Sequence, residues 1–352
     1  MRMTGKSPIL AAMLVVPLVL TGCGYGKTSS NIQPPPSSVS TTKPGDSKAN
    51  ASQTGAKATA AQNTHKTQIY LIDKHGHVAP QFLDLPTTKS VAKQVMDYMV
   101  IGGPVSEILP NGFQAVLPPG TTTSLNLKSD GTLVADFSKD FLNYDPKLET
   151  QMLQALTWTL TQFDNVKRVQ LRVKGKDLAK MPASKTDLNA SGLTRADGIN
   201  NDMGQVTDVT GSRETTVYYL SQTTSGSMYY VPVTERIAGD EQDLTAVVNA
   251  VVSGPSTATS LETPFGSDVK LVSAPSVKDG IVTLNFNDNF YANAKQKLVS
   301  DKAVDVLAMS LIGKDGIKKV SIQVDGNSKM TLESGQSLTK PVSLPDVTKS
   351  GV

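Results

Sequence analysis

The chain has 352 residues and contains little that could support covalent, redox or metal chemistry. Cys23 is the only cysteine, so no intramolecular disulfide can form and the folded part must rely on apolar cores. There are three histidines, and aromatic residues make up 5% of the chain. The formal net charge is +3, and nothing suggests the concentrated basic face that a nucleic-acid partner would require. We therefore expect no nucleic-acid partner, no metal and no cofactor.

Long apolar runs are scarce as well, and the one that stands out is Ile9–Leu20. Its twelve residues (20 − 9 + 1) fall short of the ~20 that span a bilayer as a helix, so we interpret residues 1–22 as a cleaved signal peptide. The run leads into Leu20–Cys23, which resembles a bacterial lipobox. That resemblance implies that Cys23 is acylated and becomes the first residue of the mature chain. An ordinary secretory signal with a chance cysteine is the alternative.

These features predict a protein that is lipid-anchored at the extracytoplasmic face of the cell membrane and does not span it. Residues 23–66 are rich in Ser, Thr and Pro and contain almost no large apolar side chain. Such a segment cannot bury enough surface to fold. We expect it to form a flexible tether with a coil span of roughly 35 Å.

The rest of the sequence contains an internal repeat. Gly131–Phe141 reappears as Gly280–Phe290, an offset of 149 positions (280 − 131), and each copy begins with an Asp-Gly turn. A repeat of this length indicates a duplicated domain rather than a solenoid unit. It also provides an internal control, because chemistry inherited from a common ancestor should be present in both copies.

Apolar spacing predicts the same order of elements in each copy. In the first we expect strands at Gln68–Ile72, Val78–Leu85, Ser124–Lys128, Thr132–Phe137 and Lys167–Lys174, with helices over Val91–Met99 and Leu148–Thr161. In the second we expect helices over Leu244–Val252, with Asp243 as N-cap, and Ala303–Leu311, and strands at Ile281–Phe286 and Lys319–Val324. The predicted fold class is α+β, with two tandem, homologous two-layer domains of β(β)αββαβ order.

The predicted domains span residues 67–176 and 214–334. Between them, residues 177–213 are polar and rich in Gly, Asn and Asp. This linker is either loose or packed at the domain interface. Residues 335–352 are expected to form an irregular tail.

The most specific stretch of the first repeat is Leu153–Val169, which runs from a predicted helix into a strand. Together with Pro118–Gly120 before the hairpin and Asp136–Ser138, it resembles the GerM family of two-domain lipoproteins from spore-forming bacteria. The resemblance covers both repeats and the lipobox. The second copy departs from the pattern at Ser310–Gly316 and at Gly266–Val269, which lacks the double proline.

The resemblance implies two domains like the ring-building motif of secretion systems, an α+β fold that assembles side by side. It also implies a role in sporulation and germination, within the envelope complex that joins mother cell and forespore. The implied partners are the proteins of that complex, together with the membrane through the N-terminal lipid.

One candidate metal site lies in the first repeat. His75 and His77 are spaced to supply two ligands, with Asp73 as the nearest acid. The matching Ser221–Met228 of the second repeat contains no histidine, so we favour an ordinary surface turn.

One candidate acid–base pair is Asp136 and Asp140, four residues apart. The second repeat has Asn285 and Asn289 at these positions, and an amide cannot carry out that proton transfer at ordinary pH. We expect a structural role, in which these short polar side chains bond the turn backbone. No catalytic residue is assigned, and we expect the protein not to be an enzyme.

Four tyrosines form the candidate interaction surface: Tyr218, Tyr219, Tyr229 and Tyr230. They lie as two adjacent pairs on strand-like segments, so alternation would place one member of each pair inside and one outside. The outward members could form an exposed aromatic patch that binds a partner, whereas the alternative is a purely fold-stabilising role. We expect Trp158 to belong to the core.

Three functions remain open from the sequence. The leading hypothesis is a membrane-anchored, non-enzymatic assembly or scaffold component in sporulation and germination. The second is a peptidoglycan-binding module that assists cell-wall remodelling, which would require a groove of aromatic and amide side chains in both repeats. The third is an enzyme, which the unmatched carboxylates disfavour.

Overall fold

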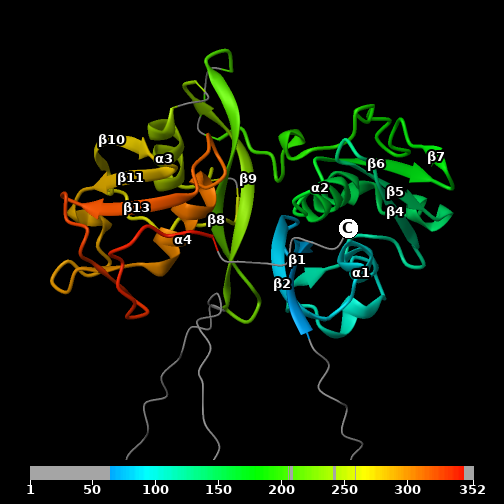
Figure 1. Ribbon diagram of the computed structural model, residues 1–352, viewed down its shortest axis with the longest axis horizontal. Coiled ribbons are helices and arrows are strands. Elements are labelled where there is room, and N and C mark those ends of the chain that lie inside the picture. Colours follow the sequence, from blue (N-terminus) through cyan, green and yellow to red (C-terminus); the bar gives the residue numbers. More distant parts are fainter. Residues whose placement is uncertain (1–63, 205, 207–208, 241–242, 258, 345–352) are drawn as a thin grey trace, which may run out of the picture. The chain divides into compact units, whose positions relative to one another are not determined.

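The computed structural model describes residues 64–204, 206, 209–240, 243–257 and 259–344 (Figure 1). The predicted signal peptide, Cys23 and all but the last residues of the predicted tether lie outside the described residues. Both repeats are described over almost their whole length. None of the described helices is long and apolar enough to cross a membrane.

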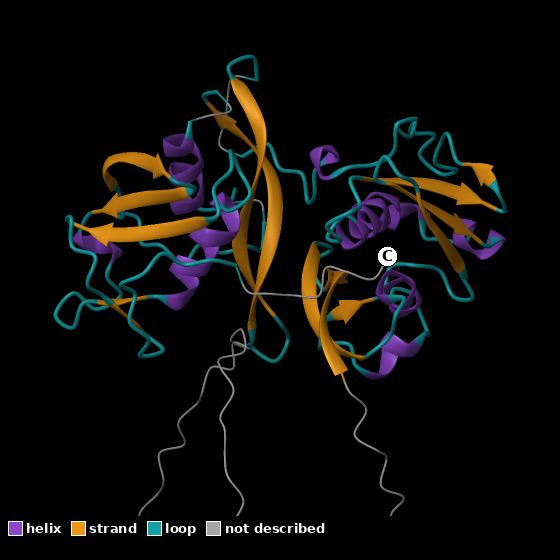
Figure 2. Ribbon diagram, in the orientation of Figure 1, coloured by secondary structure: helices purple, strands orange, loops and turns teal. Residues whose placement is uncertain are grey.

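The first repeat combines two sheets with two α-helices among the described residues (Figure 2). Its strands and helices are β1 (Thr64–Asp73), β2 (Val78–Pro86), α1 (Val91–Tyr98), β3 (Phe113–Gln114), β4 (Thr123–Leu127), β5 (Thr132–Phe137), α2 (Glu149–Leu160), β6 (Arg168–Val173) and β7 (Lys176–Asp177). Short 3-10 helices lie at Pro104–Glu107, Lys139–Leu142 and Pro146–Leu148. Strand β1 lies between β2 and β3, and the main sheet has the order β4-β5-β6-β7. Strands β5 and β6 are parallel, with α2 in the crossover between them.

The second repeat follows the same plan. Its elements are β8 (Ser212–Gln222), β9 (Met228–Ala238), α3 (Leu244–Ser253), β10 (Leu271–Lys278), β11 (Ile281–Phe286), β12 (Leu298–Val299), α4 (Asp301–Leu311), β13 (Lys319–Val324) and β14 (Thr331–Leu332). Two more 3-10 helices lie at Arg195–Asp197, between the repeats, and at Asp288–Phe290. Strands β8 and β9 form a long hairpin, and the main sheet has the order β10-β11-β13 with β11 and β13 parallel. The predicted α+β class with two repeated domains is confirmed.

The element bounds agree closely with the prediction in the most regular segments. Strands β5, β11 and β13 have the expected bounds, and the Asp243 carboxylate accepts a hydrogen bond from Ala246 N as the N-cap of α3. Strand β10 was not predicted. Its sequence, with Pro275 and little apolar alternation, lacks the period-two pattern of a half-buried strand.

A helix hydroxyl bonds to a strand amide in both repeats. Thr159 Oγ1 on α2 accepts a hydrogen bond from Tyr70 N at 3.0 Å, and Ser310 Oγ on α4 accepts one from Tyr218 N at 2.9 Å. Each bond fixes the second helix of a repeat against the first strand of its hairpin. The agreement shows that the duplicated helix and hairpin pack in the same way in both copies.

A stacked phenylalanine pair follows the central strand of each main sheet. The ring centroids of Phe137 and Phe141 are 4.2 Å apart, and those of Phe286 and Phe290 are 4.4 Å apart. All four side chains are buried. These rings fill the same part of both cores, so the repeated Phe-x-x-x-Phe pattern is a packing signature.

The polar linker is in part a structural extension of the first domain. Met181 and Leu193 are buried, and Leu193 forms an antiparallel bridge with Val169 of β6. The second repeat has a matching extension, in which Met330 is buried and Val342 bridges Val320 of β13. In each domain, therefore, the chain returns to the outer edge of the last long strand of the main sheet.

Candidate functional site

The candidate site lies where the hairpin of the first repeat meets residues of the second. At its centre is Asp73, the last residue of β1, whose side chain is fully buried. Its Oδ1 accepts hydrogen bonds from the backbone amides of His75 and His77, both at 2.8 Å, which closes the β1–β2 turn. Its Oδ2 accepts a hydrogen bond at 2.7 Å from the hydroxyl of Tyr229 on β9.

The pKa of Asp73 lies below its ordinary value. Burial by itself raises the pKa, but the hydrogen bonds from His77 and Tyr229 stabilise the carboxylate and outweigh it. Burial raises the pKa of Tyr229, so its hydroxyl keeps the proton that it donates. The bond is therefore charge-assisted, which makes it stronger than a neutral pair of the same length.

An apolar contact also joins the two repeats at Tyr229. The ring of Tyr229 meets the ring of Phe113 edge to face, with centroids 4.8 Å apart, and Phe113 belongs to β3 beside β1. A buried tyrosine of the second repeat is thus enclosed by an aromatic and an acid of the first. Such a residue anchors a contact through its ring and orients it through its hydroxyl.

Asn200, between the repeats, makes a second set of contacts. Its Nδ2 donates to Val78 O on β2 and to Pro232 O on β9, both at 2.7 Å, and its Oδ1 accepts from Val78 N at 2.8 Å. Its φ is +46°, a left-handed conformation that asparagine tolerates better than most residues. One side chain therefore bonds the backbone of a strand from each repeat.

The chain leading to Asn200 is held against α2. The guanidinium of Arg195 stacks over the ring of Trp158 at 4.5 Å from its centroid and donates to Thr161 Oγ1 at 3.0 Å. The indole Nε1 of Trp158 donates to Gly198 O at 3.3 Å. Trp158 is 3% exposed, so it is a core residue as predicted, and it also positions the connector.

The four candidate tyrosines do not form the exposed patch that alternation suggested. Tyr219 and Tyr229 are buried, while Tyr218 and Tyr230 are half-buried. The Tyr230 hydroxyl donates to Asp305 Oδ2 on α4 at 2.6 Å. The inside–outside alternation holds, but the outward members are themselves packed, because other elements cover this hairpin. The expectation of an exposed aromatic patch is therefore corrected: these side chains make packing contacts, and Tyr229 packs between the repeats.

Tyr219 has a buried acid as its partner. Its hydroxyl lies 3.0 Å from both carboxylate oxygens of Glu235 on β9, a residue that is 4% exposed. Burial raises the pKa of Glu235 to about 7, the Tyr219 hydrogen bond lowers it in part, and the charge of Asp202 raises it. Glu235 therefore titrates near neutral pH, whereas Asp73 stays ionised.

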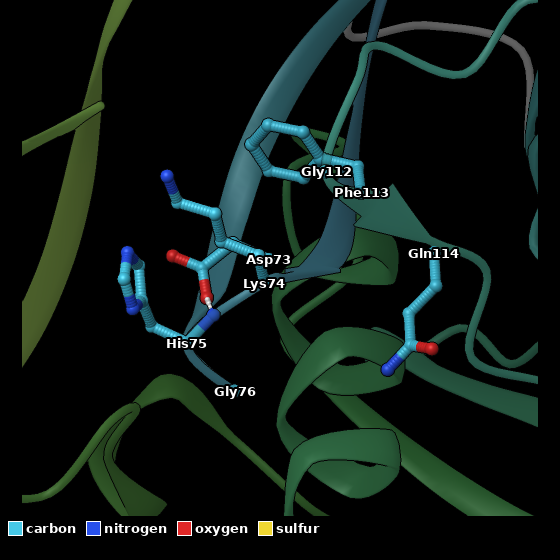
Figure 3. A pocket seen from close by; sticks show the side chains of 7 residues that line it. All are labelled: Asp73, Lys74, His75, Gly76, Gly112, Phe113 and Gln114. Atoms are coloured by element: carbon cyan, nitrogen blue, oxygen red, sulfur yellow. Dashed lines mark hydrogen bonds between the residues drawn. The ribbon is translucent and has the colours of Figure 1, made fainter. Parts of the chain in front are cut away.

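An open hollow of about 510 Å³ lies beside the turn, seen from close by in Figure 3. It is lined by Asp73, Lys74, His75, Gly76, Gly112, Phe113 and Gln114. The Asp73 carboxylate bonds the turn backbone, as the dashed line to His75 shows. Since this side chain is fully buried and bonds the turn and Tyr229, it does not present a free carboxylate to the hollow.

The two histidines of the turn lie near each other, with ring centroids 6.3 Å apart. His77 Nδ1 is 3.4 Å from Asp73 Oδ2. Among the residues that the structure describes, no group of three or more His, Cys, Asp or Glu side chains could hold a metal ion.

The candidate acid–base pair also has a structural explanation. Asp136 Oδ1 accepts a hydrogen bond from Gly175 N at 3.0 Å, and Asn285 Oδ1 accepts one from Gly326 N at 2.9 Å. The Asp136 carboxylate and the Asn285 amide thus accept the same kind of hydrogen bond at matching turns of the two repeats. Asp140 accepts a hydrogen bond from the hydroxyl of Ser138, two residues away.

Sequence reasoning identified most of these residues but not how they pair. Tyr229 and Asp73 are 156 positions apart, and the matching positions of the other repeat do not hold the same pair. Asn200 carries no motif. The one signal that could have identified it as a candidate is its position in a Gly- and Asn-rich segment between duplicated domains.

The chain is similar to known proteins over both repeats. A family model described as sporulation and spore germination, Germane, matches residues 68–179 and 216–329. The spore germination protein GerM of Bacillus subtilis (strain 168) is 42% identical over 363 aligned residues, covering 99% of this chain and 98% of that protein. The solved tandem GerMN domains of the B. subtilis sporulation protein GerM superpose with a TM-score of 0.74 at 45% identity, covering 80% of this chain and 97% of theirs.

Proposed function

This chain belongs to the Germane family of sporulation and spore germination proteins, and from that premise we propose that it acts as a lipid-anchored, non-enzymatic assembly component. The anchor is the acylated Cys23 at the extracytoplasmic face of the membrane. The partners are proteins of an envelope complex between mother cell and forespore. The tandem domains provide the binding surfaces, and the tether holds them close to the membrane.

The observation that carries the proposal is the joint between the repeats. The hydroxyl of Tyr229 reaches the Asp73 carboxylate, and Asn200 bonds strands of both hairpins. A component that bridges two partners gains affinity when its binding surfaces are fixed in advance, because less freedom is lost on binding. Confinement by a lipid also raises the effective concentration, so that weak contacts suffice.

The chemistry of the repeated positions supports a non-enzymatic role. Asp136 and Asn285 both accept one hydrogen bond from a glycine amide, so the carboxylate has a task that needs no proton transfer. The two stacked phenylalanine pairs and the two helix hydroxyls are structural in the same sense. What the duplication preserved is therefore the framework of the fold.

The test is carried out in sporulating cells with the full-length protein. Membranes are isolated, lightly crosslinked and affinity-purified, and the recovered proteins are identified by mass spectrometry. The proposal expects envelope or channel proteins with the wild type, and expects the Cys23→Ala variant to leave the membrane fraction while staying folded. Membrane retention of Cys23→Ala would exclude the anchor. Recovery of wall hydrolases and muropeptides without such a complex would contradict the assembly role and favour peptidoglycan binding.

A joint variant connects the structure to this assay. Tyr229→Phe removes the hydroxyl that reaches Asp73 and keeps the ring. Tyr230→Phe is the matched control, since its hydroxyl bonds Asp305 within the second repeat. Recovery of partners should fall with Tyr229→Phe and not with Tyr230→Phe. Equal recovery for both variants would show that a fixed joint is not needed for assembly.

A further inference from the structure

The main sheet of each repeat ends in an edge strand that has one strand neighbour among the described residues. These edges are β4 in the first repeat and β10 in the second (Figure 1). An open edge presents unpaired backbone N–H and C=O groups and can pair with another chain. The two edges occupy matching places in the duplicated fold, so each serves as a control for the other.

The edge of the second repeat is blunted. Strand β10 has register shifts between Leu271 and Ser273 and between Ser273 and Ser276. It also contains Pro275, which has no N–H to donate. Bulges and prolines are common devices that stop edge-to-edge pairing.

The edge of the first repeat carries none of these devices. The five residues of β4 pair with β5 in unbroken register, and Thr123–Leu127 contains no proline and no charge. Ser138 N donates to Thr122 O at one end of the pair, and Lys128 N donates to Thr132 O at the other. Because antiparallel bonds alternate along a strand, the even-numbered residues of β4 bond β5.

The odd-numbered residues therefore present their backbone groups at the outer edge. These are Thr123, Leu125 and Leu127, whose side chains lie on the core side of the sheet, while Ser124 and Asn126 are exposed on the other face. No isolated bridge among the described residues involves this strand. The edge is regular, uncharged and unpaired.

We propose that β4 pairs in antiparallel fashion with β4 of a second copy of this chain, centred on Leu125. This deepens the assembly role and rests on it, since the membrane anchor brings the copies together. In this register Leu125 faces its own equivalent, and Thr123 faces Leu127 of the second copy. All three positions are odd-numbered, so the outward backbone groups of both strands meet each other.

A second copy fits this edge better than an arbitrary strand because the edge is complementary to itself. Ser124 lies opposite Asn126 of the second copy, so a small hydroxyl meets an amide on the exposed face. Lys128 lies opposite Thr122 of the second copy, and the two Lys128 side chains are at opposite ends of the pair. A two-fold interface requires this kind of self-complementarity.

Cysteine mapping tests the register in full-length protein on membranes. Two differently tagged copies are co-expressed, one carrying Ser124→Cys and the other Asn126→Cys. In the proposed register these positions form a non-hydrogen-bonded pair with Cα atoms about 4.5 Å apart, which a disulfide can bridge. A chain with Ser124→Cys in both copies places its cysteines on a diagonal of about 7–8 Å, which a disulfide bridges poorly.

The expected result is an oxidised dimer that carries both tags, about fivefold more abundant than the dimer of either variant with itself. The wild type, with Cys23 alone, gives the background. Ser273→Cys with Ser276→Cys on β10 is the matched control and should stay at that background. Absence of the mixed dimer, or equal dimer from the β10 pair, would overturn the proposal.

A charge exchange then asks whether the pairing contributes to association. The variant Ser124→Lys/Asn126→Lys puts like charges opposite each other, as does Ser124→Glu/Asn126→Glu. Since Ser124 and Asn126 are both exposed, both variants should fold. Each should lose co-purification of differently tagged copies from detergent-solubilised membranes, and mixing the two should restore it. Equal co-purification in every combination would contradict the pairing.

The two proposals fail in different ways. If the cysteine pair crosslinks but no envelope proteins are recovered, the edge pairing stands and the assembly role is wrong. If envelope proteins are recovered while the cysteine pair gives no mixed dimer, assembly stands and proceeds through another surface.

Discussion

The two repeats agree in their cores and differ at their edges and at the joint. Both keep a helix hydroxyl on a strand amide, a stacked phenylalanine pair and a polar side chain on a glycine amide. Only the second has a bulged outer strand with a proline, and each brings its own residue to the joint: Asp73 from the first and Tyr229 from the second. The two copies have kept the contacts that the fold requires. They differ at the outer edge of the main sheet and at the joint between the repeats.

The largest expected effect compares the two phenylalanine stacks. Phe141→Ala and Phe290→Ala each remove a buried ring from the same part of a core. Each should lower the free energy of unfolding of its own domain by about 3–5 kcal/mol. Urea unfolding followed by domain-specific probes measures both. A cost in one repeat several times that in the other would break the equivalence of the cores.

The next effect compares the buried acids Glu235 and Asp73. The pKa of Glu235 is raised from 4.5 to about 7, so between these values the folded state holds a proton that the unfolded state has lost. The contribution of Glu235 to stability is therefore largest below pH 4.5 and is lost as the pH rises through about 7. The difference of 2.5 (7 − 4.5) corresponds to about 3 kcal/mol as an upper estimate.

Glu235→Gln should remove that slope, because a neutral amide does not titrate. Thermal or urea unfolding between pH 4.5 and 8 measures it. Asp73 behaves in the opposite sense: its lowered pKa contributes stability above its ordinary value, and that contribution disappears as the pH falls through the folded pKa. A Glu235→Gln protein with an unchanged slope in this range would refute the assignment.

A smaller effect separates the joint from the domains. Tyr229→Phe leaves Asp73 buried with one partner fewer and should cost about 1–3 kcal/mol. Amide exchange should increase in the β1–β2 turn, at His75 and His77, while the α4 core keeps its protection. Tyr230→Phe should instead affect the contact between β9 and α4. Identical exchange patterns for the two variants would mean that the joint is not a separate contact.

The smallest effect is expected at Asp136. Asp136→Asn puts in the first repeat the side chain that the second already uses, so stability should change by less than about 0.5 kcal/mol. Asp136→Ala removes the acceptor of Gly175 N and should cost about 1 kcal/mol. Chemical denaturation of the two variants measures the difference. A large loss in Asp136→Asn would show that the carboxylate has a further task.

The sequence predicted the parts of the fold that depend on local periodicity. The strand at Thr132–Phe137 and the helix capped by Asp243 were predicted because apolar spacing and capping depend on residues that are close in the sequence. Strand β10 was missed because its edge position and Pro275 remove the alternation on which prediction depends.

Most contacts of the candidate site could not be predicted, since they join distant segments. The bond from Tyr229 to Asp73 depends on how two hairpins are packed, which one sequence does not encode in any local pattern. The same packing covers Tyr218 and Tyr230, which is why strand alternation alone overestimated their exposure. Asn200 bonds backbone atoms of its partners. Because nearly every residue has these atoms, such partners cannot be recognised from the residue types.

The position of β1 has a mechanical consequence. The strand begins at Thr64, within the last residues of the predicted tether, and lies between β2 and β3, with nine residue pairs joining it to β2. A force applied to the chain ahead of Thr64 enters the fold through this strand. When it acts along the strand, the row of hydrogen bonds to β2 is loaded together in shear. A terminal strand pulled sideways would instead open one bond at a time. With the proposed membrane anchor, force on the chain would enter the first domain through a strand that is paired on both sides.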